Sequence, residues 1–300
     1  MKANLFIDSN TFKYINDTHQ QEVIKKIIDF SELLECISTN YEDEVFVNNI
    51  DFYTTEILPS VTLNDFLFVN SNEYECKDVI DLLLRLLTSF QDNNCDEETV
   101  LNIINDNNSC SGLIVLNKQN NIGVINEKQI LSTKQDWFDF HRNYLIKQPC
   151  ETTKDFLKDV RKYFIRLYIH PDNEEYIKKI YKTHLKRIIQ YLSLMNDKMI
   201  DEFKNDARYH NDFVSFLAWF KTAHSEIDDA SFQGNFKNHH EKKEFEKEFE
   251  INGEKKKFLC EPHLKMFRDD YGKNSHGRIY FKALKFEDSF IYIGLITNHI

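Results

Sequence analysis

The chain has 300 residues and a formal net charge of −11, from 38 Lys and Arg against 49 Asp and Glu. It holds seven glycines and no GxGxxG or GxxxxGK[ST] pattern, which excludes Rossmann dinucleotide sites, P-loops and glycine-rich kinase loops in their usual forms. Four prolines and 41% hydrophobic residues exclude collagen-like and Pro-rich disordered classes and are enough for a core.

The sequence carries no predicted membrane or secretion signal. No apolar run approaches the roughly 18 residues that a membrane-spanning helix needs, and Asp8 interrupts the short apolar stretch at the start of the chain. The six cysteines are scattered without a CxxC pair, which is typical of reduced, buried thiols. We therefore expect a cytoplasmic protein without membrane contact.

Residues 1–150 form a predicted acidic region of mixed α/β structure, with a net charge of −13. Short apolar runs predict strands at 5–7, 45–47, 66–69 and 113–116, and the 3.6-residue period predicts helices at 20–37 and 77–90. An Asn-Asn-Ile-Gly run predicts a turn at 120–123. Because this region is acidic, we expect any contact with RNA or DNA to involve the later regions.

Residues 151–232 form a predicted helical region. Thr152 and Asp155 resemble a capping box, and an apolar stripe continues from Phe156 to Leu167. The run at 170–173 breaks this helix, and further helices are predicted at 176–192 and 212–223.

Residues 233–300 change to a period of two and predict an antiparallel sheet. Segments 244–251 and 254–261 meet across Asn252-Gly253, the strongest short hairpin signal, which sets Glu250 opposite Lys255 and Glu248 opposite Lys257. Further strands are predicted at 278–286 and 290–297. The fold class is therefore α+β, with a mixed N-terminal region, a helical middle and a C-terminal antiparallel sheet of about four strands.

One face of this sheet carries the candidate catalytic residues. If the sheet buries its apolar side, the alternation places a polar set together on the other side: Glu261, His263, Lys265, Arg278, Tyr280 and Tyr292. A Tyr, His or Glu could take the 2′-hydroxyl proton of RNA while Lys and Arg stabilise the phosphate, without metal or cofactor. The alternative is an ordinary solvated sheet face. Pro262 predicts an edge strand or a bulge beside His263.

The C-terminal end resembles a family of uncharacterised bacterial proteins associated with mobile elements and anti-phage defence. The similar runs are Glu261-Pro262-His263-Leu264-Lys265, Arg278-Ile279-Tyr280-Phe281, and Ile291-Tyr292-Ile293-Gly294 with His299. Leu295 stands where that family has a histidine. The Arg278–Phe281 run is also similar to a strand of RelE/ParE-type toxins, many of which are ribonucleases. This second likeness implies RNA cleavage.

Two metal sites are further alternatives. The run Leu5-Phe6-Ile7-Asp8-Ser9-Asn10 resembles the opening strand of PIN-domain nucleases, whose chemistry needs three or four carboxylates around a divalent ion. Asp8 would be one of them, and Glu42, Glu44, Asp92 and Asp96 could supply others. A zinc site could join Cys260 and His263 to His239, His240, His276 or His299, although the usual paired spacing is missing.

These observations lead to one leading function and two alternatives. The leading prediction is a component of a bacterial anti-phage defence system that binds a protein partner or nucleic acid through its C-terminal sheet. The first alternative is a metal-independent, RNA-cleaving toxin that uses Glu261, His263, Lys265, Arg278 and Tyr280. The second is a PIN-like, metal-dependent nuclease. The leading prediction includes no metal and no cofactor.

Overall fold

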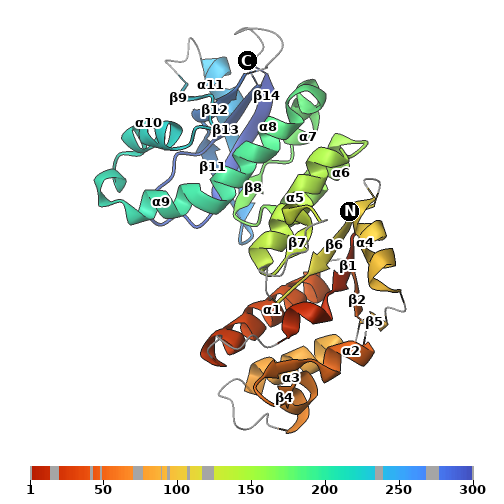
Figure 1. Cartoon of the computed structure of the whole chain (residues 1–300). Coiled ribbons are helices and arrows are strands. Elements are labelled where there is room, and N and C mark those ends of the chain that lie inside the picture. Colours follow the sequence, from red (N-terminus) through yellow and green to blue (C-terminus); the bar gives the residue numbers. More distant parts are fainter. Residues whose placement is uncertain are drawn as a thin grey trace. The chain divides into compact units, whose positions relative to one another are not determined.

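The structure is a computed structural model that describes residues 2–13, 20–40, 43–47, 49–69, 77–88, 90–92, 95–106, 109–116, 125–233, 239–267 and 277–298. The chain forms two compact units, Met1–Tyr144 and Leu145–Ile300, and the fold is α+β (Figure 1). The helical middle region and the C-terminal sheet both lie in the second unit. The turn predicted at 120–123 and the loop that holds Gly272 lie outside the described residues.

A five-stranded parallel sheet forms the centre of the first unit. Its strands are β1 (Asn4–Ile7), β2 (Glu44–Val47), β5 (Gln91–Asp92), β6 (Ser111–Ile114) and β7 (Ile130–Leu131), in the order β5-β2-β1-β6-β7. From β1 the chain adds two strands on one side and then returns to add two on the other. The strands predicted at 5–7 and 45–47 are confirmed, and the strand predicted at 113–116 begins two residues earlier.

The first unit also contains helices, some of which lie on the sheet. They are α1 (Gln20–Asn40), α2 (Asn49–Thr54), α3 (Lys77–Leu87), α4 (Glu97–Asn105) and α5 (Lys134–Lys147). One of them, α3, packs on α1. In α4, Val100 and Ile104 pack on Phe6 and Leu113 of the sheet, while α1 lies on the opposite side (Figure 1). Right-handed crossovers that leave a central strand in opposite directions produce this arrangement.

The strand predicted at 66–69 is wrong. After the small hairpin of β3 (Glu56–Leu58) and β4 (Val61–Thr62), residues Asp65–Val69 form a π-helix. Two reciprocal hydrogen bonds between Thr62 and Asp65 cap the start of this helical segment. The Thr62 N–H donates to Asp65 Oδ2, and the Asp65 N–H donates to Thr62 Oγ1, both at 3.1 Å. This capping box outweighs the β propensity of the aromatic residues that follow it.

Helix α5 was not identified in the sequence, because its apolar and polar residues do not sort into a clear stripe. Two of its side chains form hydrogen bonds with one buried carboxylate, that of Asp43, which directly precedes β2. Asp43 Oδ2 accepts from Trp137 Nε1 at 2.9 Å and lies 2.8 Å from His141 Nε2, and its Oδ1 accepts from the Ala3 N–H. These bonds fasten α5 to the amino end of the sheet.

Helices also begin the second unit. They are α6 (Thr153–Tyr163), α7 (Asn173–Tyr176), α8 (Tyr181–Leu194), α9 (Ile200–Asn205) and α10 (Phe213–Ala223). The predicted cap is confirmed, since Thr152 Oγ1 accepts from the Asp155 N–H at 3.1 Å. The continuation of this helix to Leu167 is wrong: α6 ends at Tyr163, and Leu167 opens the strand β8 (Leu167–Ile169).

The second unit contains a five-stranded mixed sheet in the order β8-β14-β13-β12-β9. The strands β9 (Asp229–Phe232), β12 (Pro262–Met266), β13 (Gly277–Phe281) and β14 (Ile291–Asn298) form an antiparallel series, and β8 joins β14 in parallel. A four-stranded antiparallel sheet is thus present. The predicted strand at 278–286 ends five residues early, and β9 occupies a position in the sheet where a strand of the hairpin was expected.

The predicted hairpin forms, but as a separate two-stranded sheet of β10 (Glu246–Ile251) and β11 (Glu254–Leu259) after α11 (His239–Phe245). Its register is confirmed, with Glu250 opposite Lys255 and Glu248 opposite Lys257. Asn252 and Gly253 have φ of 52° and 80°, as a type I′ turn requires. Residues 254–266 are therefore not one long strand, because the chain leaves β11 and enters the larger sheet at Pro262.

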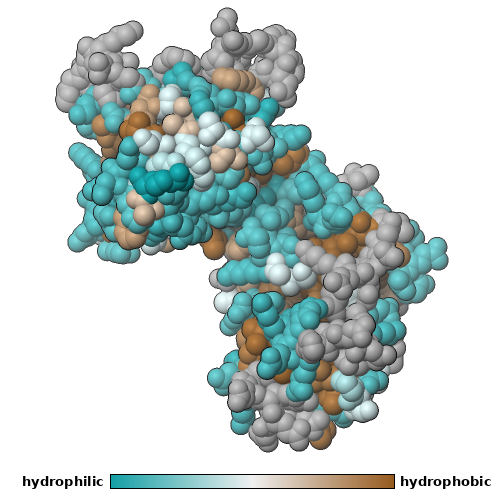
Figure 2. Space-filling model, turned by 60° about the vertical axis from the view of Figure 1, so that its left-hand side comes forward, coloured by the Kyte–Doolittle hydropathy of each residue, from teal (hydrophilic) through white to brown (hydrophobic). Residues whose placement is uncertain are grey.

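Both faces of the larger sheet are covered. Helix α8 crosses one face (Figure 1), where Tyr191 donates its hydroxyl to the Lys265 carbonyl at 2.9 Å. The hairpin and the end of α11 pack on the other face. The hydrophobic core there consists of Phe245, Phe249, Cys260, Tyr280, Tyr292 and Leu295. On the face of the molecule in Figure 2, hydrophilic side chains predominate and hydrophobic ones form separate groups.

Candidate functional site

Three of the five predicted catalytic side chains meet on the hairpin-covered face of the larger sheet. His263 lies opposite Tyr280 across β12 and β13, with ring centroids 4.7 Å apart. Arg278 Nη1 donates to the Tyr280 hydroxyl at 2.9 Å. Ser231 of β9 lies opposite His263 on its other side, with Ser231 Oγ 3.1 Å from His263 Nε2. We call Ser231, His263, Arg278 and Tyr280 the buried cluster.

This face is not the open surface that the sequence suggested. His263, Arg278 and Tyr280 are 2%, 9% and 0% exposed. The sequence pattern could not show this, because the hairpin was expected within the sheet and instead lies over it. At the end of α11, just before the hairpin, the Phe245 ring lies 5.0 Å from the Tyr280 ring. Polar residues on this face are therefore held in a protein interior, where their hydrogen bonds and charges matter more than on a surface.

Burial keeps His263 neutral. Desolvation lowers the pKa of its imidazole to about 4, and the nearby Arg278 and Lys265 charges act in the same direction. Its Nδ1 lies 3.2 Å from the Glu261 carbonyl oxygen. Because a carbonyl can only accept, Nδ1 carries the proton, and Nε2 therefore accepts from the Ser231 hydroxyl.

The remaining two predicted residues lie at the margin of the buried cluster. Lys265 Nζ pairs with Asp229 Oδ2 at 2.7 Å, and Lys221 Nζ lies 2.8 Å from the other carboxylate oxygen. Despite partial burial, these two partners lower the pKa of Asp229 to about 2. Glu261 is half-buried and contributes its backbone carbonyl to His263.

Two expectations about the neighbouring backbone are corrected. Pro262 does not mark an edge, because β12 lies between β13 and β9; it is the first residue of its strand, another position where a missing N–H is tolerated. A register shift between Tyr280 and Phe281 also changes the alternation along β14. As a result, Leu295 lies on the same face as Tyr292, whereas regular alternation along the strand would place residues 292 and 295 on opposite faces.

The structure does not support the zinc alternative within the described residues. Cys260 is buried in the hydrophobic core on the hairpin-covered face of the sheet, close to Gly294. Burial raises the pKa of its thiol to about 12. In the described part of the chain, no group of three or more His, Cys, Asp or Glu side chains is arranged to hold a metal ion. His276 and His299, and the side chains of His239 and His240, lie outside that part.

A second candidate site lies in the first unit, at the carboxyl end of β1. Asp8 follows this central strand directly, and its Oδ1 accepts from the Asn10 N–H at 2.9 Å. Burial raises the pKa of the Asp8 carboxyl, the Asn10 N–H opposes it in part, and the Glu97 carboxylate raises it further. Among the described residues, Asp8 and Glu97 are not joined by a third His, Cys, Asp or Glu side chain in a group arranged to hold a metal ion.

The strand order places Asp8 at a special point of the parallel sheet. The connection after β1 leads to one side of the sheet, and the connection after β6 leads to the other. The Asp8 N–H donates to the Ile114 carbonyl at the end of β6, so Asp8 stands between the carboxyl ends of these two strands. Open α/β sheets bind their ligands at such a topological switch point.

The acids proposed beside Asp8 in the sequence are distributed differently. Glu44 opens β2 at the opposite end of the sheet and pairs with Lys2. Asp96 caps α4 by accepting from the Thr99 N–H at 2.8 Å. Asp92 ends the edge strand β5, and Glu42 lies outside the described residues. Glu97, which the sequence analysis missed, is the acid whose charge reaches Asp8.

The position of Glu97 follows from topology. A helix that precedes a parallel strand runs antiparallel to it, so α4 begins at the same sheet edge where β1 and β6 end. The helix α2 begins there too, directly after β2. The sequence could not single out Glu97 among the many acids of this region, because its position beside Asp8 depends on the strand order of the sheet.

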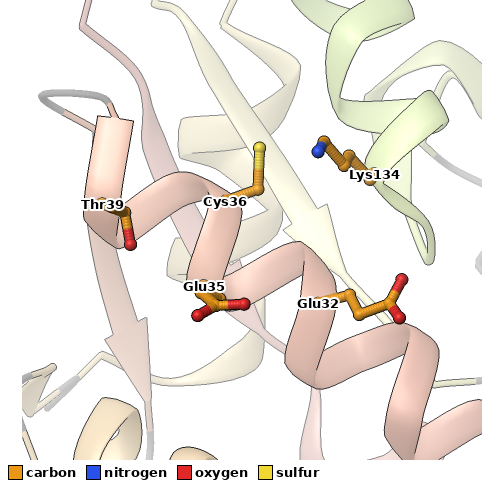
Figure 3. Close-up of a pocket in the computed structure, with 5 residues that line it drawn as sticks. All are labelled: Glu32, Glu35, Cys36, Thr39 and Lys134. Carbon is orange, nitrogen blue, oxygen red and sulfur yellow. The ribbon is translucent and has the colours of Figure 1, made fainter.

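A pocket of about 330 Å³ also opens on the first unit (Figure 3). Helix α1 contributes Glu32, Glu35, Cys36 and Thr39, and Lys134 of α5 directs its amine toward the Cys36 thiol. Burial raises the pKa of Cys36 although Lys134 opposes it. The thiol is therefore protonated at neutral pH, so this pocket presents no activated nucleophile.

Comparison with protein-family models, with curated proteins and with solved structures finds no match to this chain.

Proposed function

We propose that the first unit is a divalent-metal-dependent nuclease of the PIN-like kind, acting within bacterial defence. The observation that carries this proposal is the position of Asp8: a partly buried carboxylate at the switch point of a parallel sheet, with Glu97 close enough to raise its pKa. The likeness of residues 5–10 to the opening strand of PIN nucleases supports the choice of nucleic acid as substrate. The defence role rests on the likeness of the C-terminal end.

The chemistry of the carboxylates fits a hard cation. Asp8 and Glu97 would hold Mg²⁺ or Mn²⁺ through carboxylate oxygens. Such an ion polarises a phosphoryl oxygen and lowers the pKa of a bound water. It also offsets the negative charge of this acidic unit, which would otherwise repel a phosphate backbone.

Cleavage of labelled single-stranded RNA and DNA by the purified full chain tests the proposal. We expect cleavage in Mn²⁺ or Mg²⁺, none in EDTA, and a loss of about 100-fold or more in Asp8→Asn, because a lost ligand removes several kcal/mol of metal-assisted stabilisation. Glu97→Gln should be slower in the same direction. Asp96→Asn is the matched control, because Asn caps a helix as well as Asp and Asp96 is exposed.

Thermal unfolding gives a second measurement that does not depend on cleavage. Because the pKa of Asp8 is raised, its ionised form destabilises the folded state at neutral pH, so Asp8→Asn should raise the melting temperature without metal. Mn²⁺ should raise that of the wild type and not that of Asp8→Asn. Equal cleavage by the wild type and Asp8→Asn, or cleavage that survives EDTA, would exclude the metal nuclease.

Binding of nucleic acid or a protein partner through the C-terminal sheet stays a prediction, as does metal-independent RNA cleavage. EDTA-resistant cleavage that is lost in His263→Ala would favour the latter.

A further inference from the structure

Arg278 is a buried cation with too few partners. Arg278 is 9% exposed, and its Nη1 donates to the neutral Tyr280 hydroxyl at 2.9 Å. Its Nε is buried and has no hydrogen-bond partner among the described residues, and no carboxylate of that part of the chain forms an ion pair with it. A buried charge is normally paired, because an unpaired one costs several kcal/mol.

The neighbouring groups do not supply the missing negative charge. His263 is neutral, and Ser231 and Tyr280 carry hydroxyls. Asp229, whose charge acts on His263, is shared between Lys265 and Lys221, so these three side chains together have a net positive charge. The cluster and its margin therefore combine positive charge with several hydroxyl and N–H donors.

We infer that the buried cluster binds a phosphate group, with the Arg278 guanidinium as its principal contact. Arginine is the side chain that best matches phosphate oxygens. The Tyr280 hydroxyl accepts from Arg278 and keeps its own proton to donate, as a tetrahedral anion with several oxygens requires. Ser231, Glu261 and Lys265 are half-buried, so each of these residues is partly accessible to solvent.

This inference concerns the second unit and is independent of the nuclease proposed for the first. The phosphate could belong to a free nucleotide or to a nucleic-acid backbone, and both sources share the chemistry that Arg278 recognises. The ionisation state helps to separate them, because a terminal phosphate carries more charge than a backbone diester.

Calorimetric titration of the full chain in EDTA tests the inference with three probes: inorganic phosphate, UMP, and a short single-stranded RNA without terminal phosphates. We expect at least one to bind the wild type, and Arg278→Met to weaken it about tenfold or more. Binding of UMP but not of the RNA identifies a nucleotide site. Binding of the RNA identifies a backbone site.

The matched control is Arg166→Met, which removes an arginine of the same unit that already pairs with Asp201 through bonds of 2.7 and 2.8 Å. It should bind like the wild type. Arg278→Lys keeps the charge without the planar fork and should give an intermediate affinity.

Thermal unfolding separates a binding role from a structural one. If the role of Arg278 is to bind an anion, Arg278→Met should melt no lower than the wild type in phosphate-free buffer, because the substitution removes an uncompensated buried charge. Only the wild type should then gain stability on addition of the probe. The inference is overturned if none of the probes binds the wild type, or if Arg278→Met binds as tightly as Arg166→Met.

Discussion

At the scale of single residues, the C-terminal cluster shows how burial changes the meaning of a polar side chain. The sequence brought His263, Arg278 and Tyr280 to one face by alternation, and the structure confirms that they meet. What alternation could not supply is the layer above them, since period-two patterning describes one strand and not what covers it. The same limit explains why Ser231, on a short strand next to His263, was not selected.

His263 should make stability depend on pH. Its pKa is about 4 in the folded chain and about 6.5 when unfolded, so between these values the unfolded chain binds a proton that the folded chain does not. Its contribution is complete above pH 6.5 and is lost as pH falls to 4, by about 3 kcal/mol in total. Urea unfolding at several pH values should show this slope in the wild type and a smaller one in His263→Gln.

Burial also lowers the pKa of His170, so His170→Gln measures the part of the slope that this histidine contributes. Asp229 contributes mainly below pH 4, since its pKa is about 2 in the folded chain and 3.8 when unfolded. Parallel slopes for the wild type and His263→Gln would contradict a neutral, buried His263.

At the scale of elements, the hairpin of β10 and β11 decides the character of the second unit. Its turn and register were predicted correctly, because Asn252-Gly253 and the facing charges are local signals. Its position over the sheet was not, because that depends on contacts such as Phe249 with Tyr292, which are distant in the sequence. The switch from β11 to β12 at Pro262 is a tertiary feature of the same kind.

Gly294 allows the hairpin segment to approach the sheet. A Cβ at this position would lie 2.6 Å from Cys260 Sγ and 2.9 Å from Cys260 Cβ. We expect Gly294→Ala to lower the free energy of unfolding by about 1–3 kcal/mol through overpacking. Chemical denaturation measures this, and adding Cys260→Ala should recover part of the loss.

Gly253→Ala is the comparison, because a Cβ at the turn meets nothing within 4 Å and only the positive φ of 80° opposes it. Its cost should be about 1 kcal/mol, and Cys260→Ala should not reduce it. A double variant of Gly294 and Cys260 that is no more stable than Gly294→Ala alone would show that the contact is not responsible.

At the scale of the whole molecule, the chain joins two units with separate sheets and separate cores. The acidic charge of the first 150 residues and the change of period after residue 233 were visible in the sequence. The union of the helical middle with the C-terminal sheet was not, because it depends on β8 and β9, two strands of three and four residues that flank the helices. Short strands carry too few residues for a periodic signal.

The two units should respond to different ligands. Scanning calorimetry of the full chain should show that Mn²⁺ raises one unfolding transition and that a phosphate probe raises another. A fragment of residues 1–148, which keeps α5 whole, should retain the Mn²⁺ response and lack the phosphate response. One transition that both ligands shift equally would indicate that the units unfold as one.

The place of β14 in its sheet has a consequence for synthesis on the ribosome. This strand lies between β8 and β13, yet it is made after every other described strand of that sheet, and its partner β8 was made more than a hundred residues earlier. The first unit can fold as it emerges, whereas the second must wait for its interior strand. A chain whose synthesis stops before β14 would therefore leave the second unit without the strand that joins β8 to β13, while the residues of the first unit are complete.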